Sequence, residues 1–261
     1  MKIFRKSIKK LVPNKALFIY RSLRAFLYGE KEIRFLRKLI DPKKEAIDIG
    51  ANLGEYAFWM SKHASHVHAF EPHPDCISFL KTVKPKNMSL YQYALSSETS
   101  KKELLVPKDE SSQEVTCRAS ISKMSVRDFD KHNKLTVETI ALDEIITKNI
   151  GFIKIDIEGH EFEAIKGMEK LIHTCKPIMQ VEIEQRHHKS SITEIFDYIL
   201  DFGYSGFFLQ NSHLVSIGKF NVEDNQEKIL YFFTEDNTDF KEQYVNNFIF
   251  IPNTIVNKYL F

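Results

Sequence analysis

Short apolar runs alternate with amphipathic stretches along the middle of the chain. Runs with the length and composition of strands lie at 46–49, 67–70, 90–94, 152–157 and 178–184. Stretches with helical spacing follow them at 56–63, 75–82, 161–171 and 192–202. Strands separated by helices of this length predict an α/β, Rossmann-like fold, in which a mainly parallel sheet is covered by helices on both faces.

Two regions depart from this alternation. Residues 96–149 are more polar and irregular, with predicted strands at 103–106 and 136–140. Near the C-terminus, 204–209 and 229–233 are predicted to form a final strand pair, which adds antiparallel pairing to the sheet. Ligands of such sheets bind at the carboxyl ends of the strands, so the loops at that edge are the candidate site.

The first 40 residues form a predicted basic, amphipathic, helical extension, followed by one domain over 41–261. They contain twelve Lys or Arg and two acidic residues, Glu30 and Glu32, so the extension carries +10 and the remainder of the chain −8. Apolar residues recur between the charges at helical intervals. One interpretation is helices packed on the domain with a solvated basic face; the other is an arm attracted to an anionic membrane surface, a lipid-linked glycan or a phosphorylated substrate.

Composition narrows the class of protein. No window is long enough and apolar enough for a membrane span, and the early run 16–20 is too short for a secretory signal. The three cysteines, Cys76, Cys117 and Cys175, are widely spaced and are interpreted as reduced thiols. We therefore expect a cytoplasmic protein, with the inner face of the membrane as the alternative location. No nucleic-acid module is evident, and the arm makes a homo-oligomer a further hypothesis.

A loop with two glycines follows the first predicted strand. Residues 48–54 read Asp-Ile-Gly-Ala-Asn-Leu-Gly and open a helix, as a nucleotide-binding loop requires. The spacing is GxxxG rather than the GxGxxG of dinucleotide sites, and Asp48 precedes it. A carboxylate at this place suits S-adenosylmethionine, which carries a sulfonium and no phosphate, better than a pyrophosphate.

An acidic residue ends the second predicted strand. Glu71 lies 21 residues after Gly50 and is followed by Pro72. At about this distance an acidic residue takes the two ribose hydroxyls of an adenosine, because its two oxygens accept from both. The loop and Glu71 together predict a nucleotide-type cofactor.

At this point the chain resembles the FkbM family of S-adenosylmethionine-dependent methyltransferases. The similar blocks occur in the family's order and include DIGANLGEYAF, AFEPHPDCISFL, ALSS, ALDEI, FIKIDIEGHEFEAIKGM and VEIEQ, within residues 45–185. The late NNFIFIP is also similar to the family's ending. The resemblance implies a class I methyltransferase fold and methyl transfer to oxygen, commonly on sugars or secondary metabolites.

The resemblance also implies cofactor contacts. These are Asp48, Gly50, Asn52, Gly54 and Glu71, with Pro72, Ala94 and Asp156 at the same predicted sheet edge. The arm lies outside the matched blocks, so the family says little about it.

Ionisable residues end the strand at 152–157. Asp156, Glu158 and His160 lie at or beyond its carboxyl end. An alcohol is a poor nucleophile until a base removes its proton or a metal lowers its pKa. His160 has the ordinary pKa closest to neutral and is the simplest candidate for the base, with Asp156 and Glu158 positioning the acceptor or competing for that role. The family often has a small residue where this chain has His160.

The next strand adds further candidates for acceptor binding: Glu182, Glu184, His187 and His188. Asp156, Glu158 and Glu182 together would also suit magnesium or manganese, so a catalytic metal stays open beside a metal-independent base and purely structural roles.

The sequence thus predicts an O-methyltransferase that uses S-adenosylmethionine and acts on a hydroxyl, above all that of a sugar in a bacterial surface glycan or its precursor. The alternatives are a divalent-metal-dependent O-methyltransferase of a secondary metabolite and a cofactor-binding partner protein without turnover. A nicotinamide-dependent oxidoreductase is disfavoured by the glycine spacing.

Overall fold

The computed structural model describes residues 13–108, 116, 119–122, 125, 131–146, 149–232 and 243–259. The first twelve residues of the basic extension and Cys117 lie outside these ranges. Cys76 and Cys175 form no disulfide bond with each other. No helix in the described ranges has the length and apolar character needed to cross a lipid bilayer.

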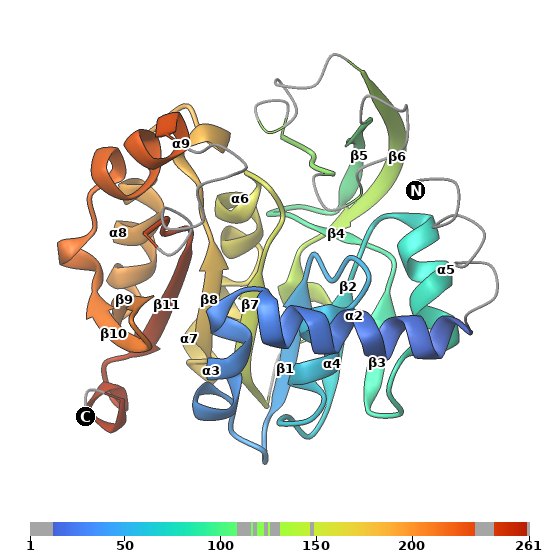
Figure 1. The fold of residues 1–261 in the computed structure, drawn as a ribbon, viewed down its shortest axis with the longest axis horizontal. Helices are drawn as coiled ribbons and strands as arrows, with labels where there is room; N and C mark the ends of the chain where they lie inside the picture. The colour runs from blue at the N-terminus through green and yellow to red at the C-terminus, as the bar shows by residue number, and fades with distance from the viewer. Residues whose placement is uncertain are drawn as a thin grey trace.

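Within the described residues, eight strands form the main sheet (Figure 1). They are β1 (Glu45–Ile49), β2 (Val67–Phe70), β3 (Met88–Tyr91), β7 (Ile150–Ile155), β8 (Ile178–Glu182), β9 (Tyr204–Gln210), β10 (His213–Ser216) and β11 (Asn247–Pro252). Their order is β10-β9-β11-β8-β7-β1-β2-β3, and the five strands from β8 to β3 are parallel. β11 inserts antiparallel between β8 and β9. This mainly parallel sheet confirms the predicted class I methyltransferase fold.

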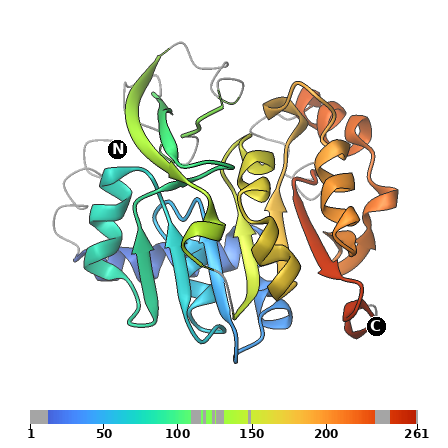
Figure 2. The ribbon, with the colours of Figure 1, turned by 180° about the vertical axis from the view of Figure 1, so that it is seen from behind.

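Helices cover both faces of the sheet (Figures 1 and 2). They are α2 (Asn14–Tyr28), α3 (Lys31–Leu39), α4 (Glu55–Met60), α5 (Pro74–Val83), α6 (Glu161–Lys166), α7 (Glu169–Cys175), α8 (Thr193–Asp201) and α9 (Lys228–Phe232). α3 and α4 bury Leu36 and Met60 against one face, and α6 to α8 bury residues such as Ile165 and Ile199 against the other. The central strands are buried on both sides and most of their side chains are apolar, as a doubly covered parallel sheet requires.

A second, smaller sheet stands beyond the carboxyl edge of the main sheet (Figure 1). It contains β4 (Ala94–Leu95), β5 (Ser100–Pro107) and β6 (His132–Ile140), in the order β4-β6-β5. β5 and β6 contain the predicted strands at 103–106 and 136–140. The predicted strand at 90–94 is divided, since its first part belongs to β3 and its last residue to β4.

Two sequence predictions about elements were wrong. The predicted helix 161–171 is two helices, because the Asp143 carboxylate accepts the backbone N–H groups of Lys170 and Leu171 at 2.9 Å and so caps a new helix. The described part of the predicted strand 229–233 lies in helix α9. There the Gln226 side chain donates to the carbonyls of Ile183 and Val245, which holds a helical turn above the sheet, and β11 takes the place beside β9.

The described part of the N-terminal extension packs on the rest of the chain. On α2, the buried Phe18 contacts Phe58 edge-on with ring centroids 5.4 Å apart, and Trp59 Nε1 donates to the Ser22 carbonyl at 2.8 Å. Arg21 forms an ion pair with Glu55. Burial of this kind explains why the apolar residues of the extension recur at helical spacing.

Candidate active site

One cavity of about 310 Å³ lies at the carboxyl edge of the main sheet, below the small sheet. Its lining includes ten of the residues that the sequence singled out: Gly50, Asn52, Glu71, Pro72, Ala94, Asp156, Glu158, His160, Glu182 and Glu184. Four others do not line it: Asp48, Gly54, His187 and His188. The predicted cofactor loop and the predicted catalytic loop therefore meet around one space.

Gly50 allows these two loops to touch. Its φ of +80° lies in the left-handed region, and a Cβ at this position would stand 1.9 Å from the carbonyl oxygen of Asp156. The Asp156 N–H in turn donates to the Ile49 carbonyl at 3.0 Å. The glycine is thus required by a close approach of backbones. Gly54, also left-handed, has a different role, since its missing Cβ makes room for Leu80 of α5.

Glu71 joins the loops after β1 and β2. Its side chain is buried, its Oε2 accepts the Asn52 N–H at 2.7 Å, and its Oε1 accepts the His73 N–H at 2.8 Å. Burial raises the pKa of Glu71 to about 7 despite these two hydrogen bonds. Each oxygen keeps a further lone pair, so the predicted contact with ribose hydroxyls is compatible with this arrangement.

Buried charged residues of β1 and β7 lie next to the cavity residue Asp156. Asp48 is fully buried on β1 beside Lys154 of β7. Burial raises the pKa of Asp48 to about 6. Lys154 Nζ lies 2.8 Å from Asp156 Oδ2 and 4.4 Å from the centre of the Tyr56 ring. Burial opposes the charge of Lys154, but Asp156, Asp48 and Glu30 together raise its pKa. Asp48 is therefore buried in the sheet and does not line the cavity.

His160 stands at the start of α6 with its ring at the cavity. Its Nε2 lies 3.1 Å from Ser96 Oγ, which also accepts from Lys102 Nζ at 3.0 Å. Burial, followed by the charge of Lys102, lowers the pKa of His160 below its usual value. The imidazole is therefore neutral at pH 7, the state that a general base requires.

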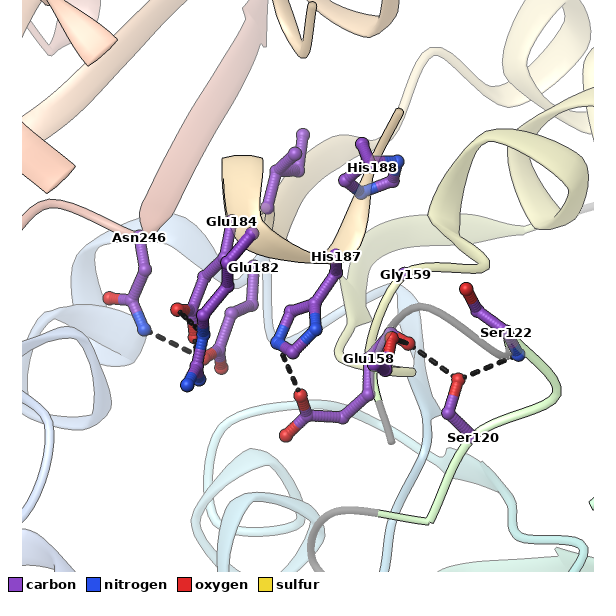
Figure 3. A network of polar contacts seen from close by, with 12 residues as sticks. Ser120, Ser122, Glu158, Gly159, Glu182, Glu184, His187, His188 and Asn246 are labelled. Atoms are coloured by element: carbon purple, nitrogen blue, oxygen red, sulfur yellow. Dashed lines mark hydrogen bonds and ion pairs between the residues drawn. The ribbon is translucent and has the colours of Figure 1, made fainter. Parts of the chain in front are cut away.

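Glu158 occupies a left-handed turn between β7 and α6, with φ of +53°. Its carbonyl accepts a hydrogen bond from the Ser120 hydroxyl at 2.5 Å (Figure 3). It also accepts one from the Ser125 hydroxyl, and both serines belong to the segment between β5 and β6. Its carboxylate faces His187, whose Nε2 lies 2.9 Å from Glu158 Oε2 (Figure 3). His188 Nε2 lies 3.1 Å from Glu161 Oε2. The two histidines predicted to bind acceptor thus pair with carboxylates beside the cavity.

Three carboxylates gather on the β8 side of the cavity. Glu182 accepts from Asn246 Nδ2 at 2.6 Å (Figure 3). Glu184 accepts from both Nε and Nη2 of Arg186, at 2.6 and 3.0 Å. Glu30, which precedes α3, accepts from the Tyr56 hydroxyl at 2.5 Å. Burial raises the pKa of both Glu30 and Glu182, and neighbouring carboxylates, Asp156 among them, add to the rise. In the described part of the chain, no group of His, Cys, Asp or Glu side chains has an arrangement that would hold a metal ion.

The structure adds site residues that sequence reasoning missed. Glu30 and Arg186 line the cavity, and Ser120 and Ser125 hold the Glu158 turn. Arg186 directly follows the VEIEQ block, so its position was a usable signal. Glu30 was assigned to the basic arm, and the two serines lie in the irregular region, where no pattern places a residue in space.

The fold and cavity define a class of protein: an α/β enzyme with a glycine loop after β1, an acidic residue after β2 and ionisable groups after β7. The family model of the methyltransferase FkbM domain matches residues 48–205, more than half of the sequence. The chain belongs to this family of methyltransferases.

Comparison with individual proteins gives more distant similarities. The hexuronic acid methyltransferase AglP of Haloferax volcanii is 27% identical over 180 residues, which cover 65% of this chain and 68% of that protein. Among solved structures, the methyltransferase FkbM of Methylobacillus flagellatus has a TM-score of 0.48 at 16% identity, covering 92% of this chain and 55% of that longer one. An rRNA methylase of Streptococcus thermophilus has a TM-score of 0.43 at 9% identity, covering 84% and 91%.

Proposed function

We propose that this protein transfers the methyl group of S-adenosylmethionine to a hydroxyl of a sugar. The observation that carries the proposal is the cavity that joins the glycine loop, Glu71 and His160. Gly50, Asn52 and Glu71 would hold the cofactor, with Pro72, Ala94 and Asp156 beside them. Glu71 and Asp156 give this part of the lining a negative charge, which favours a sulfonium and disfavours the pyrophosphate of a nicotinamide cofactor.

The cofactor supplies an activated methyl group, so this chain must activate the acceptor. In the proposed step the acceptor oxygen bonds to the methyl carbon, the carbon–sulfur bond breaks, and the neutral thioether leaves. The hydroxyl proton passes to the neutral Nε2 of His160. Asp156 and Glu158 are held in ion pairs with Lys154 and His187, whereas His160 Nε2 contacts the Ser96 hydroxyl, which an acceptor hydroxyl can replace. The proposal therefore assigns the base to the histidine and uses no metal.

Charge in the cavity favours an acceptor sugar without a carboxylate. Six acidic side chains line it, and the one arginine among the described lining residues, Arg186, is held by Glu184. Among the described residues, Glu30 and Glu182 form no ion pair, and because burial raises the pKa of both, their carboxyl groups can accept from sugar hydroxyls or donate to them. A hexuronic acid, the substrate in the name of the Haloferax volcanii relative, would add a like charge.

The proposal is tested with purified protein, methyl-labelled S-adenosylmethionine and a panel of neutral sugars, amino sugars and hexuronic acids. We expect label to enter a neutral or amino sugar, with transfer unchanged by a chelator. Label in hexuronic acids alone would overturn the proposed acceptor class. A loss of transfer on chelation would favour the metal-dependent alternative. Tight S-adenosylhomocysteine binding with no transfer to any acceptor would favour the partner protein without turnover.

Replacing Glu71 by alanine should weaken S-adenosylhomocysteine binding at least about tenfold, or about 1.4 kcal/mol. Because its pKa lies near 7, affinity of the parent protein should fall as pH decreases from about 8 to about 6 and the carboxylate is protonated. Glu71→Gln should lose that pH dependence. Titration calorimetry measures both, with exposed Asp75→Asn as the control. Unchanged affinity in a folded Glu71→Ala protein would remove Glu71 from the cofactor site.

Replacing Glu30 by glutamine should raise the KM for the acceptor about fivefold or more while S-adenosylhomocysteine affinity stays within about twofold. The reason is that Glu30 lines the cavity from the position before α3, and its hydrogen bonds within the described residues are with Tyr56 and Asn247 rather than with a residue of the glycine loop. Glu194→Gln, an exposed change on α8, is the matched control. An unchanged KM would show that Glu30 serves only its hydrogen bond with Tyr56.

A further inference from the structure

Helix α2 carries a stripe of exposed apolar side chains. Among the described residues, six large apolar side chains are exposed, and five of them belong to α2: Ile19, Tyr20, Leu23, Leu27 and Tyr28. Ile19, Leu23 and Leu27 recur every four residues and so lie along one side of the helix. The sixth, Leu230, lies far away in sequence on α9. Exposed apolar side chains gathered on one element are unusual in a folded protein and indicate a binding surface.

The opposite side of α2 is fixed, so the helix cannot turn to hide the stripe. Phe18 and Ser22 are buried, and Phe26 packs on Trp59 with ring centroids 4.5 Å apart. The ion pair between Arg21 and Glu55 adds a polar contact on the inner side. The apolar stripe is therefore held facing outward by the packing of α2 on α4 and α5.

Positive charge borders the stripe. Lys15 and Arg24 are exposed. At 100° per residue they stand about 80° and 100° from Leu23, on opposite sides of it. Residues 1–28 contain eight Lys or Arg and no acidic residue. An apolar face with a cation on either side matches a lipid surface, since the acyl chains accommodate apolar side chains and the anionic headgroups attract the cations.

We propose that α2 docks lengthwise on a bilayer that contains anionic lipids, with Ile19, Leu23 and Leu27 entering the acyl boundary. A second copy of the chain is a poorer occupant, because two such faces would bring the Lys15 and Arg24 side chains of both copies together. The cavity residue Glu30 comes two residues after α2 ends, so docking would hold the cavity beside the membrane. The docking itself does not depend on the proposed reaction.

The test is co-sedimentation of the full chain with vesicles of phosphatidylcholine alone or with about a quarter phosphatidylglycerol. We expect binding to the anionic vesicles that falls in high salt. The triple variant Ile19→Ser, Leu23→Ser, Leu27→Ser should bind at least about tenfold less, and so should the charge variant Lys15→Glu, Arg24→Glu. Leu230→Ser and the exposed pair Lys86→Glu, Lys101→Glu are the matched controls and should bind as the parent does.

Thermal unfolding checks that the triple variant retains its fold. Equal binding to both kinds of vesicle, or anionic binding that the triple variant retains, would overturn the proposal. A concentration-dependent dimer in the absence of lipid, abolished by the triple variant, would assign the stripe to a second copy instead. S-adenosylhomocysteine binding, measured in parallel, reports the cofactor site separately, so failure of docking is distinguishable from failure of the proposed function.

Discussion

Replacing His160 by alanine is expected to slow methyl transfer at least about a hundredfold, with S-adenosylhomocysteine affinity within about twofold of the parent. The imidazole stands at the cavity, and burial keeps it neutral at pH 7, so it is ready to take the hydroxyl proton. The loss should fall on kcat more than on KM, because the proton is transferred only in the transition state. Single-turnover kinetics with labelled cofactor measures this step.

The rate of methyl transfer should depend on pH in the way expected for ionisation of His160. A base must be unprotonated, so the rate should fall as pH decreases through the pKa of His160, which burial places below its usual value. The acidic limb should therefore lie below about pH 6.5 and should disappear in the alanine variant. An unchanged acidic limb in that variant would assign the base to a carboxylate.

Two variants control for other consequences of the change. His173→Ala removes an exposed imidazole from α7 and should leave the rate unchanged. Ser96→Ala removes the hydroxyl 3.1 Å from His160 Nε2, so the ring loses one contact while staying in place. We expect a smaller loss of rate, about three- to tenfold. Full activity of His160→Ala would show that the histidine only begins α6.

The sequence pattern predicted the central strands correctly because the apolar composition that marks a strand locally is also what burial in the middle of the sheet requires. β1, β2 and β7 are short apolar runs buried on both faces, and that burial is the property the pattern records. The apolar run near 230 met the same criterion and is a helix. This segment is helical because of the hydrogen bonds of Gln226 and because β11, a later segment of the chain, pairs with β9. A pattern read over a few apolar residues contains no information about either interaction.

Ten of the predicted site residues line one cavity because the carboxyl ends of parallel strands lie at the same edge of the sheet. Counting charged residues along the chain was less informative about which residues line the cavity. Counting placed Glu30 in a basic arm, yet its side chain is drawn to the cavity by Tyr56 and Asn247. Conversely, Asp48 stands at the expected place in the sequence but is buried and does not line the cavity. The net charge of a segment is a sum over all its residues, whereas a binding site depends on which individual side chains face the cavity.

Replacing Gly50 by alanine should remove cofactor binding and destabilise the protein by about 3 kcal/mol or more. Two penalties add at this position. A left-handed φ costs an alanine about 1 kcal/mol, and the new Cβ would stand 1.9 Å from the Asp156 carbonyl, so the two loops that line the cavity must separate. Urea unfolding measures the stability, and titration with S-adenosylhomocysteine measures the binding, which should fall more than about a hundredfold.

Gly203→Ala separates the two penalties. Gly203 has nearly the same left-handed φ, +82°, but a Cβ there would meet no atom within 4 Å. It should therefore lose only about 1 kcal/mol of stability and bind S-adenosylhomocysteine as the parent does. The difference between the two variants isolates the contact between Gly50 and Asp156. Equal destabilisation by both would mean that the loops after β1 and β7 can part freely, and the cavity could then not depend on their close approach.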